Sequence, residues 1–140
     1  MISNYVKFLL NDKLIVINNP DPNQTILNYI RTELKKTGTK EGCSEGGCGA
    51  CTIVLGELAD NEIEYKAINS CISFVPSLNG KQLIIVEDLV SENGKLHPVQ
   101  RHKLPDIESV INSLLRFLLF LNIENKAITN PGVQKPHWEP

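Results

Sequence analysis

The sequence has little net charge and no long apolar run. Its 14 Lys and Arg residues nearly balance 16 Asp and Glu, for a formal net charge of −2, and both signs are mixed along the chain. No basic stripe is present to neutralise phosphates, so we expect no nucleic-acid partner. The most apolar run, 114–121, is interrupted by Arg116 and is too short to cross a bilayer, so we expect no membrane span.

The first residues also lack the marks of a secretory leader. Residues 1–11 contain neither a basic start before an apolar stretch nor a small-residue cleavage site. We therefore expect a cytoplasmic protein, in which four cysteines are more often metal ligands or redox groups than disulfides. A compact chain of this length buries roughly two thirds of its unfolded surface, so the cysteines are not needed to staple the fold.

The pattern of apolar and turn residues predicts one α+β domain over residues 1–92. Thr25 is the expected N-cap of a helix with apolar residues at helical spacing, and we expect Gly38 to end that helix. The predicted strands are 5–10, 13–17, 52–55, 63–68 and 83–86. This order of elements is best matched by a β-grasp, in which one helix lies across a mixed sheet.

Residues 93–140 have a different character and form a predicted tail. Within it, 106–122 reads as a helix that is apolar nearly all round. Such a helix requires burial on several sides, and the tail alone offers little surface for that. We therefore expect it to dock on the β-grasp domain or on another chain.

The chemistry of the chain lies in its cysteines. Cys43, Cys48 and Cys51 form a C-x4-C-x2-C motif, and nineteen residues separate Cys51 from the fourth cysteine, Cys71. This is the plant-type arrangement for a [2Fe–2S] cluster, which needs one more distant cysteine. The motif therefore predicts four ligands and leaves no cysteine over.

Glycines surround the first three cysteines. Gly42, Gly46, Gly47 and Gly49 are predicted to allow positive φ and to let backbone N–H groups point at the sulfurs, which offsets their negative charge. A bulky side chain at Gly47 or Gly49 is expected to block that approach. Ser44 is a further candidate donor.

Other uses of four cysteines fit less well. A four-cysteine zinc site usually has two C-x2-C pairs, and this chain has one. Two disulfides do not suit a cytoplasmic protein. Inert core cysteines do not explain a glycine-packed loop holding three of them. No Ser/His/Asp or paired-carboxylate arrangement is evident, so no catalytic residue is predicted.

The cysteine segment resembles a known family. Residues 37–52, the Asn69-Ser70-Cys71 triplet and residues 94–100 closely resemble the N-terminal iron–sulfur domain of the xanthine dehydrogenase family of molybdenum hydroxylases. The resemblance covers about residues 4–100. It implies a relay from a molybdopterin centre through two [2Fe–2S] clusters to FAD, with the plant-type cluster nearer the flavin.

The resemblance stops after Gln100. The family continues with a helical domain that carries four further cysteines, whereas no cysteine follows Arg101 here. We therefore expect FAD and molybdopterin only on partner chains or domains, or a reading frame that diverges after Gln100 by truncation or frameshift.

The leading hypothesis is an electron-transfer component of a xanthine-dehydrogenase-like oxidoreductase. It would pass electrons toward a flavin on another domain or subunit and would have no substrate site of its own. The alternatives are a free-standing ferredoxin-like carrier and a non-functional truncated remnant.

Overall fold

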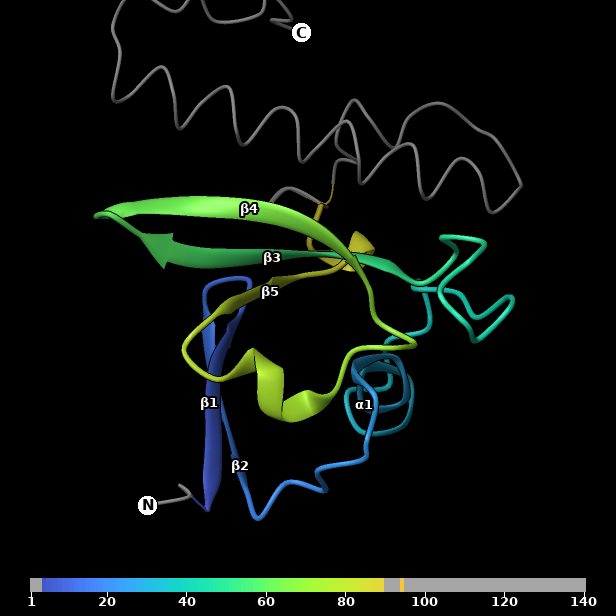
Figure 1. Cartoon of the computed structure of the whole chain (residues 1–140), viewed down its shortest axis with the longest axis horizontal. Helices are drawn as coiled ribbons and strands as arrows, with labels where there is room; N and C mark the ends of the chain where they lie inside the picture. The colour runs from blue at the N-terminus through green and yellow to red at the C-terminus, as the bar shows by residue number, and fades with distance from the viewer. Residues whose placement is uncertain (1–3, 90–93, 95–140) are drawn as a thin grey trace, which may run out of the picture.

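A computed structural model describes residues 4–89 and Gly94 (Figure 1). Five strands, one α-helix and two 3₁₀ helices alternate along the described chain. Their bounds are β1 Tyr5–Leu10, β2 Lys13–Asn18, α1 Ile26–Thr32, β3 Thr52–Ala59, β4 Glu62–Asn69, η1 Val75–Leu78, β5 Gln82–Ile84 and η2 Val86–Leu89.

The five strands form one sheet in the order β2-β1-β5-β3-β4. β1 runs parallel to β5, and every other neighbouring pair is antiparallel, so the sheet is mixed. β5, the last strand among the described residues, fills the gap between the two hairpins β1–β2 and β3–β4. One helix, α1, packs on this sheet, and the predicted β-grasp is confirmed.

Apolar residues of α1 and the sheet share one core. Ile26 and Ile30 of α1 are fully buried and lie in one cluster with Phe8 of β1 and Ile53 of β3. The cluster is closed by Val75 and Leu78 of η1 and by further residues of β1, β3 and β5. This core holds α1, β3 and β4 in place, and the loop that carries three of the cysteines connects α1 to β3.

The opposite face of β3 is also covered. Val54 belongs to a second buried cluster with Ile84 of β5 and Leu89 of η2. Because successive side chains of a strand point to opposite faces, Ile53 and Val54 enter different clusters. β3 is therefore held from both sides immediately after the cysteine loop.

The helix is shorter than predicted, and Gly38 does not end it. α1 stops at Thr32, and Glu33 and Leu34 both donate their backbone N–H to the carbonyl of Tyr29. Lys35 then takes a left-handed conformation with φ of 56°. This reversal supplies the turn that a glycine was expected to supply, because a helix commonly ends on one left-handed residue.

The strands after the cysteine loop also differ in length from the prediction. β3 and β4 are both longer, because Asp60 and Asn61 take positive φ and make a tight turn that lets pairing continue to the tip. β5 is shorter. Asp88 accepts the backbone N–H of Ile85 and donates its own to the Ile85 carbonyl, which turns the chain into η2.

The predicted tail helix at 106–122 and the boundary at 92/93 lie outside the described residues. Among the residues described, no helix is long and apolar enough to cross a membrane.

Candidate metal centre

The four cysteines come together where β3 begins and β4 ends. The loop between α1 and β3, drawn at the right-hand edge of Figure 1, carries Cys43, Cys48 and Cys51. Cys71 follows β4, which ends at Asn69. β3 and β4 pair antiparallel with Thr52 opposite Asn69. Strand pairing alone therefore brings the flanking cysteines of the two strands together.

Backbone N–H groups surround two of the sulfurs. Cys43 Sγ accepts from the N–H of Glu45, Gly47 and Cys48 at 3.5, 3.2 and 3.3 Å. Cys48 Sγ accepts from the N–H of Cys43 and Ala50 at 3.4 and 3.5 Å. Five backbone N–H groups of the loop thus donate to two of its sulfurs.

The thiols differ in acidity for identifiable reasons. The backbone N–H of Glu45, followed by the backbone and side chain of Cys48, lowers the pKa of Cys43 to about 7. Burial, together with a hydrogen bond to the Cys51 thiol, raises the pKa of Cys71. These side-chain contacts pair Cys43 with Cys48 and Cys51 with Cys71. The charge of Cys43 also acts to raise the pKa of Cys71, so the two pairs are not independent of each other.

Known proteins are similar to the part of the chain that contains the four cysteines. Residues 8–76 match the model of the 2Fe-2S iron-sulfur cluster binding domain. The chain is 48% identical over 100 residues to xanthine dehydrogenase of Blastobotrys adeninivorans, covering 70% of this chain and 7% of that protein. It is 43% identical over 95 residues to xanthine dehydrogenase of Drosophila pseudoobscura pseudoobscura, covering 66% and 7%.

The N-terminal part of the chain is an iron–sulfur domain of the xanthine dehydrogenase family. The resemblance read from the cysteine segment is thereby confirmed. The chain spans less than a tenth of the length of these relatives. Among solved structures, quinoline 2-oxidoreductase from Pseudomonas putida 86 has the same fold, with a TM-score of 0.64 at 21% identity over 96% of this chain and 85% of that one.

The thiol arrangement fits the cluster of this family. In a [2Fe–2S] cluster with four cysteines each iron takes two thiolates, as the pairs 43/48 and 51/71 would supply. In the described part of the chain, no three His, Cys, Asp or Glu side chains are grouped to hold one ion.

The glycines behave differently from one another. Gly46 and Gly49 take positive φ, of 80° and 74°, as expected, but Gly42 and Gly47 do not. A Cβ at Gly42 would lie 2.8 Å from Cys48 Sγ, so close approach to a sulfur is what requires that glycine. A Cβ at Gly47 would lie 4.0 Å from Cys43 Sγ, so a methyl group fits there, and the expected block by a bulky side chain stays a prediction.

Ser44 also departs from expectation. Its hydroxyl donates to Glu41 Oε1 at 2.7 Å and not to a sulfur. Its contribution is conformational instead, because it takes φ of 57° within the loop. Ser44 thus joins Gly46 and Gly49 as a left-handed residue of the loop, although positive φ was expected only at glycines.

The segment leading into the loop is tied to two other elements. Arg31 near the end of α1 donates to the carbonyl of Thr39 at 2.9 Å, and Glu87 of η2 accepts the N–H of Gly38 at 2.7 Å. A Cβ at Gly38 would lie 2.6 Å from Val86, so this glycine allows close packing. Neither hydrogen bond could be predicted from the sequence, because each joins residues from separate parts of the fold.

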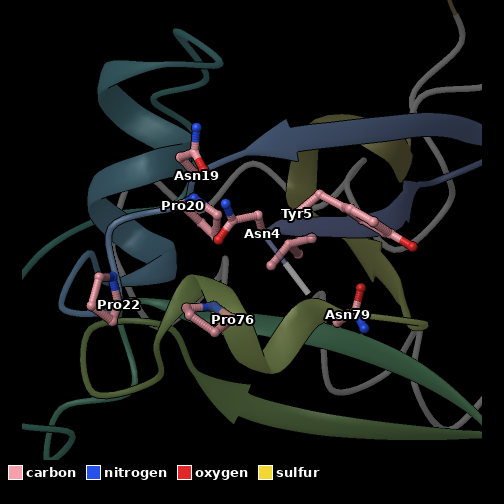
Figure 2. A pocket seen from close by; sticks show the side chains of 8 residues that line it. Asn4, Tyr5, Asn19, Pro20, Pro22, Pro76 and Asn79 are labelled. Carbon is pink, nitrogen blue, oxygen red and sulfur yellow. The ribbon is translucent and has the colours of Figure 1, made fainter. Parts of the chain in front are cut away.

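A pocket of about 470 Å³ lies at the start of β1, away from the cysteine loop (Figure 2). Its lining residues are Asn4, Tyr5, Val6, Asn19, Pro20, Pro22, Pro76 and Asn79. None of these side chains carries a charge at neutral pH, and none is a cysteine. The candidate centre is therefore the exposed cysteine loop and not this pocket.

Proposed function

We propose that the four cysteines hold one [2Fe–2S] cluster, which carries single electrons in a molybdenum-hydroxylase type of oxidoreductase. The ligands are Cys43, Cys48, Cys51 and Cys71. The observation that carries this proposal is the set of five backbone N–H groups that donate to the sulfurs of Cys43 and Cys48. Neither a disulfide nor an inert core thiol requires such donors.

The cluster, when bound, accepts and releases one electron. The chain's own residues bind it through thiolates and direct N–H dipoles at the sulfurs, which stabilises the added negative charge. Cys51 is buried at 2% exposure, whereas Cys48 is exposed. The Cys43–Cys48 side is therefore the side from which an electron would leave the domain.

The family resemblance supplies the partners of this proposal. Residues 1–92 would form the electron-carrying domain, and 93–140 a separate tail. Electrons would pass toward a flavin on another domain or subunit, with FAD and molybdopterin held there. Substrate oxidation would take place on those parts and not on this chain, in the cytoplasm.

Anaerobic reconstitution with iron and sulfide tests the cluster. We expect about two irons and two labile sulfides per chain and a rhombic EPR signal after reduction. Zinc in place of iron would refute the proposal. The variant Cys71→Ser should lose most of the signal, because one iron then keeps a single thiolate, while its circular dichroism stays that of the wild type.

Isolation from the native source tests the partners. Co-purification with flavin- and molybdenum-containing chains is the expected result for a subunit. A chain that purifies alone with a reversible cluster would instead be a free-standing carrier.

A further inference from the structure

One side chain from the end of β4 reaches into the cysteine loop. Asn69 Nδ2 donates to the carbonyl of Gly46 at 2.8 Å. That carbonyl belongs to the same peptide unit as the N–H of Gly47, which donates to Cys43 Sγ at 3.2 Å. Asn69 therefore holds one end of a peptide whose other end faces a sulfur.

The start of β3 repeats this arrangement. Thr52 Oγ1 donates to the carbonyl of Gly49 at 2.6 Å, and the N–H of the same peptide unit, from Ala50, donates to Cys48 Sγ at 3.5 Å. The Gly49 carbonyl also accepts the backbone N–H of Thr52 at 3.1 Å. This second peptide is thus held by two donors from one residue.

Both of the held peptides follow a glycine in the left-handed region. Gly46 has φ of 80° and Gly49 has φ of 74°. Glycine adopts either sign of φ readily, so its own backbone does little to fix the orientation of the peptide that follows. A donor on the carbonyl is what would keep the opposite N–H directed at the sulfur.

We infer that Asn69 and Thr52 are positioning residues that set the reduction potential of the cluster through these two peptides. The inference rests on the proposed function. A hydrogen bond accepted by a carbonyl polarises its peptide and strengthens the N–H as a donor. Donors to the sulfurs stabilise the reduced cluster more than the oxidised one, because it carries one more negative charge, so they raise the potential.

The turn after β4 does not depend on the side chain of Asn69. The Asn69 carbonyl accepts the backbone N–H of Ile72 at 3.4 Å and the hydroxyl of Ser73 at 3.0 Å. These bonds hold the turn through the backbone of Asn69. Removing the Asn69 side-chain amide therefore removes its hydrogen bond to the Gly46 carbonyl. The hydrogen bonds that the turn makes to the Asn69 carbonyl remain.

Redox titration of four reconstituted variants tests the inference. Asn69→Ala should lower the one-electron reduction equilibrium constant by between about twofold and tenfold, where tenfold is about 59 mV. Thr52→Val should shift it the same way but less, because the Thr52 N–H still holds Gly49. Thr52→Ser keeps the hydroxyl and should restore the wild-type potential. Ser73→Ala, the matched control, removes a hydrogen bond of the same turn and should shift nothing.

Hydrogen exchange on the iron-free protein gives a readout independent of the cluster. The Gly47 amide should exchange faster in Asn69→Ala than in the wild type or Ser73→Ala. Unchanged exchange, or unchanged potentials in loaded Asn69→Ala and Thr52→Val, would overturn the inference and leave the cluster proposal standing. If Asn69→Ala does not fold, the potentials of Thr52→Val and Thr52→Ser test the inference instead: a lowered potential in the first and a wild-type potential in the second support it, and equal potentials overturn it. A wild type that binds no two-iron cluster refutes the proposed function itself.

Discussion

At the scale of single residues, two adjacent glycines of the cysteine loop differ in how well the structure tolerates a side chain in their place. Gly46 has φ of 80°, and a Cβ there would lie 2.7 Å from the end of the Ile72 side chain. Gly47 has neither feature. Gly46→Ala should therefore lower the free energy of unfolding by about 1–2 kcal/mol, mostly from the left-handed backbone, and Gly47→Ala by less than about 0.5 kcal/mol.

Urea unfolding of the iron-free variants measures both effects. Equal losses at the two positions would show that the loop relaxes and that its φ values carry no cost. The Ile72 contact alone is a weak constraint, because the end of that half-exposed side chain can move aside.

The tight curl of this loop could be predicted from the sequence, but the part that each of its residues plays could not. Four glycines near three cysteines indicate a tightly curled loop, and it is one. Which residue takes positive φ depends on where the sulfurs and carbonyls finally lie, so Ser44 takes positive φ whereas Gly42 and Gly47 do not. Asn69 lies two residues before the predicted ligand Cys71, yet no spacing rule relates it to a carbonyl twenty-three residues away.

At the scale of elements, α1 depends on its first turn. The helix has seven residues, and Thr25 Oγ1 accepts the N–H of Asn28 at 3.1 Å. Thr25→Ala should cost about 1 kcal/mol of stability, and Thr25→Ser, which keeps the acceptor, should cost little. Chemical denaturation of the pair measures the cap, and equal losses in both variants would assign the effect to packing of the Thr25 methyl group instead.

Element types were predictable from periodicity, and element ends were not. Thr25 was expected as the N-cap and is one, because a capping bond is local in sequence. The end of α1 was misplaced because Lys35, exposed and charged, takes the left-handed conformation more commonly found at Gly or Asn. The end of β5 depends on Asp88 reaching back to Ile85, a bond that apolar alternation does not encode.

At the scale of the whole molecule, the core and the candidate centre are separate. The main buried cluster is built from α1, η1 and the strands and contains no cysteine. Of the four cysteines only Cys51 is buried. Folding of the domain therefore draws its free energy from apolar burial, as expected for a chain long enough to form its own core.

Iron removal should consequently leave a folded protein. Chelation under reducing conditions should abolish the visible absorption of the cluster and lower the melting temperature, because a ligand that binds only the folded state stabilises it. The loss should stay well below the total stability of a domain, which is about 5–15 kcal/mol. Near-ultraviolet circular dichroism and a single cooperative melt of the stripped sample measure this. A stripped chain that melts without cooperativity would behave like a zinc finger, whose fold is supplied by the metal, and the buried cluster of α1 and the sheet would then be insufficient to hold the β-grasp by itself.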